Sequence, residues 1–128
     1  MSRVLWKSQP DAHDYPAAAS YLSLLVDPDP VELIVGRLKA APIAHYKAKD
    51  ILRASGLDDL PAENVHVAKD IAKVKSGKAL SPVLLVRGDM LHGVPLQVAD
   101  GYHRVCASYR LDEDTDIPCR IVGLAEPS

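Results

Sequence analysis

The sequence predicts an α+β domain in which a small mixed sheet is covered by helices and preceded by a helical hairpin. Three short apolar segments have the length and the Val, Leu and Ile content of strands: Pro82–Arg87, Pro95–Ala99 and Ile117–Val122. Segments with apolar residues three or four positions apart precede and separate them, which is typical of helices packed on a core. At 128 residues the chain has the usual length of one domain, so we expect a single domain over 1–128.

The first 42 residues predict an irregular arm followed by two helices. Residues 1–15 form the arm. Pro16 suits a helix start, and good helix formers continue through Ala17–Leu25. Asp29 can cap a second helix with Pro30 at its first position, and the apolar face of that helix ends near Pro42. The short break between the two helices predicts a helical hairpin.

A third helix is expected over Tyr46–Ala54, with Gly56 ending it in a left-handed conformation. A strand through Asp50–Arg53 stays open, because the apolar run there is short. We therefore expect residues 1–60 to be a helical extension and residues 61–124 to form the core of the domain.

The second half predicts one helix, then strands around a final helix. Asn64 can cap the first helix, and Gly77 ends it. The loop at Gly88–Gly93 joins two strands, and a helix follows from Gly101 to about Leu111. Its apolar positions, which we expect to face the sheet, are Tyr102, Val105, Cys106 and Tyr109.

Charge and composition exclude several classes of function. The net charge is −2 and the pI is about 6.2, so the broad basic surface needed for non-specific DNA binding is not expected. No apolar run reaches the roughly 18 residues of a membrane span. Cys106 and Cys119 are the only cysteines, and without a signal peptide they indicate reduced thiols and a cytoplasmic location.

The segment Asp100–Arg104 carries the clearest chemical signal. A strand ends there and a helix begins, so unpaired backbone N–H groups and the positive end of the helix dipole meet at one point. Gly101 allows close approach of a ligand, and the guanidinium of Arg104 suits phosphate oxygens. His103 and Arg104 also lie at the helix end where cations are disfavoured, which indicates an anion nearby.

Each of these residues has an alternative role. Asp100 can cap the helix by accepting the His103 N–H, or it can hold a Mg²⁺ that bridges to a phosphate. Gly101 can serve only the tight turn, and Tyr102 can be a core residue instead of a stacking surface. Arg104 can instead pair with the acidic loop at Asp112–Asp116.

Other candidate residues are less specific. Lys69 and Lys73 lie one helical turn apart and could line a phosphate pocket, although a solvated helix face is the more common arrangement. Cys106 falls on an apolar stripe and is interpreted as a small core residue. The other four histidines show no metal-ligand spacing: His13, His45, His66 and His92.

The order of these parts resembles the ParB/sulfiredoxin superfamily of nucleotide-binding domains. The resemblance covers about Asn64 to Val122 and rests on the Asp-Gly-Tyr-His-Arg box, the preceding Pro-strand and the Ile117-Pro118 start of the last strand. It implies a ParB/sulfiredoxin-like core. It also implies that a nucleotide such as ATP, CTP or ADP, with Mg²⁺, binds through these residues: Gly101, Tyr102, His103 and Arg104.

The box also departs from its relatives at one position. Sulfiredoxins carry their catalytic Cys where this chain has Tyr102, so reduction of a sulfinic acid is not expected. ParB proteins have an acidic residue there, which argues against their CTP hydrolysis.

The leading hypothesis is a nucleotide-binding protein. If it is an enzyme, phosphoryl transfer or NTP hydrolysis fits best, with Asp100 as base or metal ligand and His103 assisting. The alternative is a non-catalytic regulatory or partner-binding module with a vestigial pocket. A nuclease is a third possibility, disfavoured by the acidic net charge. A small-molecule nucleotide is the expected partner, and a homodimer or a protein partner stays open.

Overall fold

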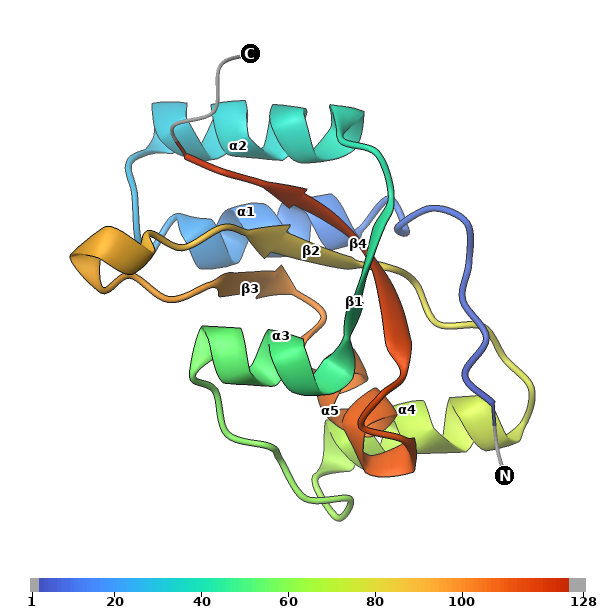
Figure 1. Cartoon of the computed structure of the whole chain (residues 1–128). Helices are drawn as coiled ribbons and strands as arrows, with labels where there is room; N and C mark the ends of the chain where they lie inside the picture. The colour runs from blue at the N-terminus through green and yellow to red at the C-terminus, as the bar shows by residue number, and fades with distance from the viewer. Residues whose placement is uncertain (1–2, 125–128) are drawn as a thin grey trace.

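The structure is a computed structural model, and it describes residues 3–124. In chain order its elements are α1 (Asp14–Leu22), α2 (Pro28–Ala40), β1 (Ala44–Lys47), α3 (Ala48–Ser55), α4 (Val65–Lys75), β2 (Val83–Val86), the 3-10 turn η1 (Met90–His92), β3 (Gln97–Asp100), α5 (Tyr102–Leu111) and β4 (Asp116–Val122). The four strands form one sheet in the order β1-β4-β2-β3 (Figure 1). Only β2 and β4 run parallel, so the sheet is mixed as the sequence predicts.

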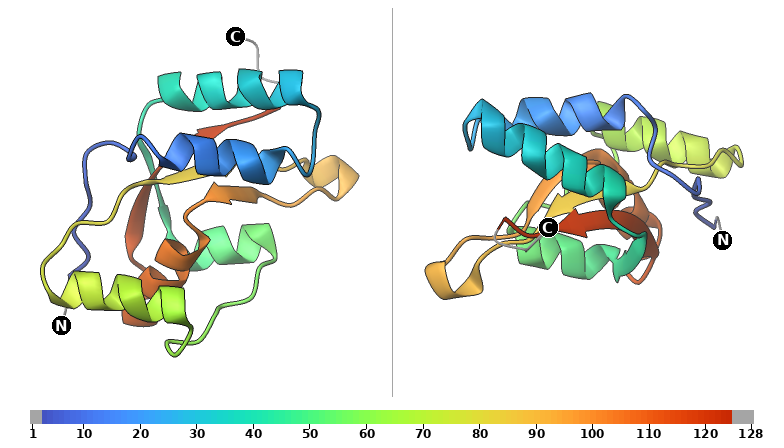
Figure 2. Two further views of the ribbon diagram at one scale, coloured as in Figure 1. Left: turned by 180° about the vertical axis from the view of Figure 1, so that it is seen from behind. Right: turned by 90° about the horizontal axis from the view of Figure 1, so that it is seen from above.

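Helices cover both faces of the sheet (Figures 1 and 2). The hairpin of α1 and α2 lies on one face, while α3 and α5 lie on the other, with α4 packed against α5. The central strand β2 supplies both cores because its side chains alternate between the faces. Val83 and Leu85 join the cluster under α3 and α5, and Leu84 and Val86 join the cluster under α1 and α2.

The predicted helical hairpin is confirmed, but both of its helices begin earlier than expected. Helix α1 begins at Asp14, which places Pro16 inside the first turn, where its missing N–H is not needed. Helix α2 begins at Pro28 after Asp27, because the first of two consecutive Asp-Pro pairs starts it. Asp29 and Pro30 therefore lie in the first turn and are not the cap and first residue.

The helix expected over Tyr46–Ala54 is wrong in its first two residues. Those residues belong to β1, an edge strand whose register pairs Ala44 with Cys119 and Lys47 with Asp116. This segment is a strand because it pairs with β4, which follows about 70 residues later in the chain. Four residues alone show too little periodicity to predict a strand. The open alternative of a strand through Asp50–Arg53 is also wrong, since α3 covers it and ends at left-handed Gly56 as predicted.

The first 60 residues are therefore not purely a helical extension, since β1 lies within the sheet and α1 packs on β3. The arm is tied to the body by an isolated bridge between Trp6 and Leu80. In the second half, the predicted cap at Asn64 is confirmed, because its side chain accepts the His66 and Val67 amides at 3.0 and 3.2 Å.

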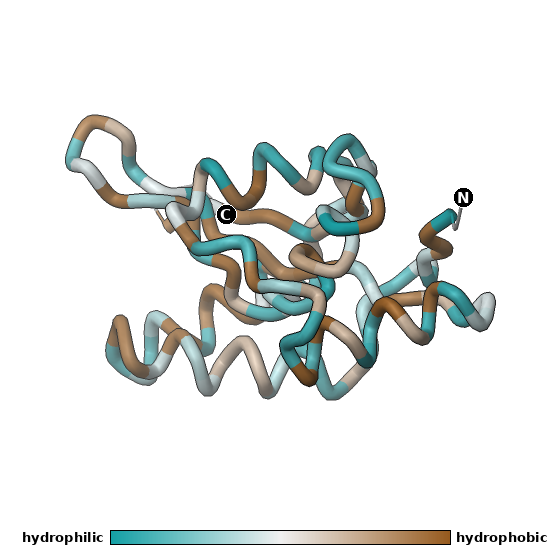
Figure 3. The backbone as a smooth tube through the Cα atoms, turned by 90° about the horizontal axis from the view of Figure 1, so that it is seen from below, coloured by the Kyte–Doolittle hydropathy of each residue, from teal (hydrophilic) through white to brown (hydrophobic). Residues whose placement is uncertain are grey.

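Most apolar side chains are buried between these layers, but a few lie at projecting turns. Figure 3 shows hydrophobic positions at the tip of the hairpin between β2 and β3. Met90 and Leu91 there are 91% and 89% exposed. Within residues 3–124, no helix is long and apolar enough to cross a membrane.

Candidate functional site

The site is built around the junction of β3 and α5, where Gly101 has φ +108°. This conformation is strained for any residue with a side chain. A Cβ at this position would also lie 2.4 Å from Val83 Cγ1 and 2.8 Å from Arg104 Nη2. The left-handed turn and the close packing of Val83 and Arg104 against it therefore both require glycine. Of the two roles expected for Gly101, this is the tight turn.

Asp100 does not cap the helix, and this expectation was wrong. The cap position is Gly101, so Asp100 lies one residue too early and still belongs to β3. Its Oδ2 instead accepts a hydrogen bond from Arg104 Nη2 at 2.6 Å. Burial raises the pKa of the Asp100 carboxyl, and the neighbouring guanidinium opposes that rise.

Arg104 holds together a polar network that joins three parts of the chain. Besides Asp100, its Nη1 donates to Ser81 Oγ at 2.5 Å and lies 3.6 Å from Asp14 Oδ2. Ser81 Oγ donates to the same Asp14 oxygen at 2.9 Å, and that oxygen also accepts the Asp11 amide at 3.1 Å. The Asp14 side chain is only 3% exposed, so its charge needs this compensation.

These contacts correct the second interpretation of Arg104. It does not pair with the acidic loop at Asp112–Asp116, which lies at the other end of α5. The sequence correctly indicated an anion beside the cation in the first turn. Those anions are the protein's own carboxylates, Asp14 and Asp100. Neither Asp14 nor Ser81 was identified from the sequence, because they lie 67 residues apart and no local pattern links them.

A polar cavity of about 260 Å³ opens at this corner. Gly101 to Arg104 form one wall, and no described side chain caps the amides of the first turn of α5. Lys7 and Lys73 also line the cavity, together with Asp11 and Asp70. Lys69 does not line it, so the structure brings only one of the two predicted lysines to the site.

His103 lies against His66 of α4, with ring centroids 4.6 Å apart. Burial and, to a lesser extent, His66 lower the pKa of His103, so its imidazole is neutral at pH 7. Asp70 on the same face of α4 has a pKa raised by burial. Tyr102 packs beside His103 and donates its hydroxyl to the Asp58 carbonyl at 2.6 Å, so it braces the loop before α4.

One group of three potential metal ligands lies beside the cavity within residues 3–124. Asp11, His13 and Asp14 each offer an atom, and these atoms lie within 4.8 Å of one another. The sequence analysis assigned no metal-ligand spacing to His13, although Asp11 and Asp14 lie within two residues of it. Asp100, the expected metal ligand, has one oxygen already bound to Arg104.

Cys106 is a buried free thiol, as is Cys119. Burial raises the pKa of both thiols, that of Cys119 to about 11. Raised values keep the unreactive thiol form at neutral pH. The interpretation of Cys106 as a core residue is therefore confirmed by its position.

Comparison with known proteins gives no family assignment: no protein-family model, curated protein or solved structure was found to match this chain.

Proposed function

We propose that the corner at Asp100–Arg104 binds the phosphate groups of a small ligand, and that this ligand is a nucleotide, as the resemblance to the ParB/sulfiredoxin superfamily implies. The observation that carries the proposal is the uncapped first turn of α5, which forms a wall of a polar cavity. Free amides at a helix N-terminus bind phosphate oxygens. Lys73 adds positive charge to the same cavity, and Lys7 lies there paired with Asp11 at 2.8 Å.

The volume of the cavity supports a binding mode in which it encloses only the phosphate groups of the ligand. Sites that enclose a whole small ligand usually measure about 300–1,000 Å³. At about 260 Å³ this cavity is smaller, so the phosphates lie inside and the nucleoside lies outside. The exposed ring of His66 on α4 lies nearby, tilted by 40° against the ring of His103 on α5.

A divalent cation fits the charge balance of the corner. The carboxylates of Asp11, Asp70 and Asp100 line the cavity and match in number its three cations, Lys7, Lys73 and Arg104. The corner therefore has no excess of positive charge for a polyphosphate unless a divalent cation accompanies it.

We propose Asp11, His13 and Asp14 as the ligands of this cation in place of Asp100. Asp11 would exchange its ion pair with Lys7, at 2.8 Å, for the cation, and Asp14 would offer Oδ1, since its Oδ2 accepts hydrogen bonds from Ser81 and the Asp11 amide. Carboxylates with an imidazole suit Mn²⁺ better than Mg²⁺, which prefers oxygen alone. A bound cation would neutralise phosphate charge.

If a reaction takes place, His103 is the residue suited to proton transfer. It lines the cavity, and its lowered pKa leaves the imidazole free to accept a proton at neutral pH. Asp100 is less suited, because Arg104 holds one of its oxygens. His103 therefore replaces Asp100 as the candidate base for phosphoryl transfer.

The test is a titration with ATP, CTP and ADP, each with Mg²⁺ or Mn²⁺. Calorimetry measures the affinity, and thermal unfolding measures the shift of the melting temperature. Lys73→Gln should weaken binding by about tenfold or more, because a charge-assisted hydrogen bond is lost. Lys69→Gln is the matched control, one turn away on α4 and outside the cavity, and should change affinity less than about twofold. Absence of binding to all three nucleotides, or equal effects of both substitutions, would overturn the proposal.

A second candidate is a regulatory or partner-binding module whose pocket no longer takes a ligand. It is favoured by one observation: the guanidinium of Arg104 is already occupied by Asp100, Ser81 and Asp14. In that case the corner is a structural network, and no nucleotide would shift the melting temperature of the wild-type protein.

A further inference from the structure

The N-terminal arm, which precedes α1 as residues 3–13, forms one wall of the phosphate cavity. Lys7, Asp11 and His13 line the cavity from this arm. The other lining residues belong to the body of the domain: α4, the segment before β2 and the junction of β3 and α5. A ligand in the cavity therefore contacts the arm and the body at once.

Few contacts hold the outer part of the arm on the body. Figure 2 shows the arm beside the segment that leads into β2, where it exchanges two backbone hydrogen bonds of 2.8 Å with Leu80. Within the part of the chain that the structure describes, these are the only backbone hydrogen bonds between residues 3–9 and the rest of the protein. Half-buried Trp6 packs on the core cluster under α3 and α5, and the Gln9 side chain accepts a hydrogen bond from Arg120. A segment held by so few contacts opens at a lower free energy than the core.

Lys7 brings the positive charge of the arm to the cavity, and it already has a partner. Its Nζ donates to Asp11 Oδ1 at 2.8 Å. Both residues belong to the arm, so this ion pair does not tie the arm to the body. The Lys7 side chain is 47% exposed, and exposed ion pairs contribute little to stability, so its ammonium changes partner at small cost.

We propose that Lys7 leaves Asp11 for the phosphate of the ligand when the cavity fills, and that this exchange couples ligand binding to docking of the arm. The inference rests on the phosphate site proposed above. The divalent cation proposed there takes the place of Lys7 at Asp11, so neither charge loses its partner. The phosphate then joins Lys7 of the arm to Lys73 and the α5 amides of the body.

Such coupling makes the arm a regulatory element. Thermodynamic linkage is reciprocal, so a ligand that binds better when the arm is docked must stabilise the docked arm by the same factor. Any partner that draws the arm away from Leu80 would weaken ligand binding to the same extent.

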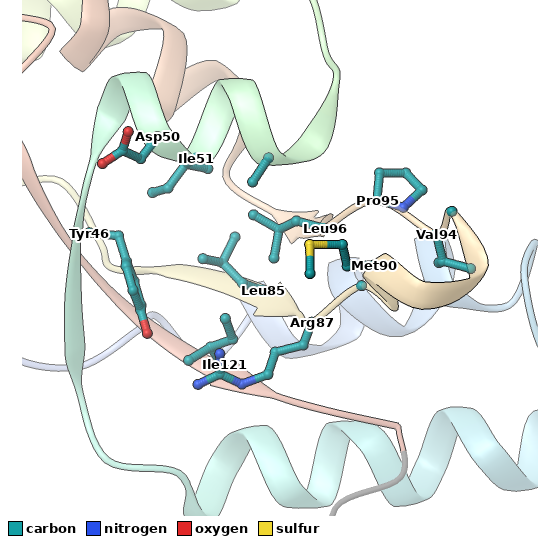
Figure 4. A pocket seen from close by; sticks show the side chains of 13 residues that line it. Tyr46, Asp50, Ile51, Leu85, Arg87, Met90, Val94, Pro95, Leu96 and Ile121 are labelled. Atoms are coloured by element: carbon teal, nitrogen blue, oxygen red, sulfur yellow. The ribbon is translucent and has the colours of Figure 1, made fainter.

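Two isolated β-bridges provide a reporter and its control. The bridge of Trp6 to Leu80 places the amides of Lys7 and Leu80 in hydrogen bonds between arm and body. The bridge of Asp89 and Val94 closes the hairpin of β2 and β3 with two bonds of 2.8 and 2.9 Å. Val94 lines a separate cavity of about 640 Å³ beside α3 (Figure 4), which shares no lining residue with the phosphate corner.

The experiment is amide hydrogen exchange followed by NMR, with and without saturating ADP and Mg²⁺. We expect exchange at Lys7 and Leu80 to slow about fivefold or more, because opening of the arm costs the Lys7 contact with phosphate. Exchange at Asp89 and Val94 should change by less than about twofold. Adenosine, which has no phosphate, should leave all four amides unchanged.

Lys7→Met removes the exchanging charge. It should weaken ADP binding about fivefold or more and abolish the slowing at Leu80. Lys49→Met is the matched control, because Lys49 pairs with Asp114 at 2.8 Å and is 43% exposed but does not line the cavity. It should leave both quantities within about twofold of the wild-type values.

Trp6→Ala tests the coupling without changing a lining residue, since Trp6 holds the arm but does not line the phosphate cavity. It should weaken ADP binding about fivefold or more, by the linkage given above. Urea unfolding midpoints establish that each variant is folded.

Failure of this inference is distinguishable from failure of the phosphate site. If ADP binds and shifts the amide signals of Gly101–Arg104 while exchange at Lys7 and Leu80 stays unchanged, the site stands and the arm is a passive wall. Equal effects of Lys7→Met and Lys49→Met on ADP affinity would also remove Lys7 as a ligand. If ADP binds nowhere in the corner, the phosphate site and the coupling are both wrong.

Discussion

Arg104 contacts acceptors from three separate segments: Asp14 at the start of α1, Ser81 before β2, and Asp100 at the end of β3. Its side chain is 15% exposed, so the ion pairs are largely desolvated. Removing one partner of such a network leaves uncompensated buried charge, which costs more than the intact network contributes. At the scale of single residues, this arginine fixes the corner, whether or not a ligand binds there.

Arg104→Met should therefore lower the free energy of unfolding by about 3–5 kcal/mol, because it leaves Asp14 and Asp100 without their cation. The control is Arg53→Met. Arg53 pairs with Asp50 at 3.1 Å but is 83% exposed, so its removal should cost no more than about 1 kcal/mol. Urea denaturation at pH 7 measures both. Similar values for the two variants would mean that the network contributes little to stability.

Gly101→Ala tests the turn itself. We expect a loss of about 2–4 kcal/mol, since alanine is strained at φ +108° and its Cβ would overlap Val83. Gly36→Ala is the contrasting variant, because Gly36 lies inside α2 and no atom of residues 3–124 lies within 4 Å of the added carbon. It should raise stability by about 0.5–1 kcal/mol. If thermal unfolding shows that both substitutions shift the melting temperature in the same direction, the strain assigned to position 101 is ruled out.

At the scale of elements, the sequence was most informative where a residue acts on its own neighbours. Asn64 caps α4 through amides two and three residues away, and Gly56 and Gly77 end α3 and α4 with positive φ. Strand β1 escaped prediction because only its pairing with β4 makes it a strand. The site followed the same rule. Gly101 and its turn were predictable, whereas Ser81 and Asp14 reach Arg104 only through the fold.

The contact between α4 and α5 should make stability depend on pH. The folded protein lowers the pKa of His103 below its ordinary value of 6.5, through burial and the adjacent His66. As the pH falls below this value, the unfolded chain takes up the proton first, so the free energy of unfolding decreases. Asp70 has the opposite effect at lower pH. Because its pKa is raised above the ordinary value of 3.8, the folded protein takes up this proton first as the pH falls, and the free energy of unfolding increases there.

The measurement is urea unfolding of the wild-type protein and of His103→Asn between pH 7.5 and 5.5. The wild-type protein should lose stability across this interval, and the variant should lose less. An identical slope in both proteins would show that another group is responsible.

At the scale of the whole molecule, two apolar clusters lie on opposite faces of one sheet. Both cysteines belong to the cluster under α3 and α5 and are 0% exposed. The sheet supplies five of the twelve buried residues of one cluster and four of the nine of the other, so local opening of one face should not occur without the other. Thiol exposure should consequently report unfolding of the molecule as a unit.

We expect Cys106 and Cys119 to react with a disulfide reagent at pH 8 only as fast as the protein unfolds, and urea should accelerate both together. Their raised pKa values slow the reaction further. Val65→Cys provides an exposed reference, since Val65 is 76% exposed on α4. If the native thiols reacted as fast as this reference, the packed core described above would be incorrect.

The alternation of side chains along β2 has a consequence for anyone who wishes to shorten this protein. The segment 61–124 contains three of the four strands, yet Leu84, Val86, Ala99 and Val122 point toward α1 and α2. Deleting the first 60 residues would leave those four side chains in water on an uncovered sheet, together with an unpaired edge on β4. Such a fragment should aggregate, so trimming from the N-terminus is a poor route to a minimal version of the fold.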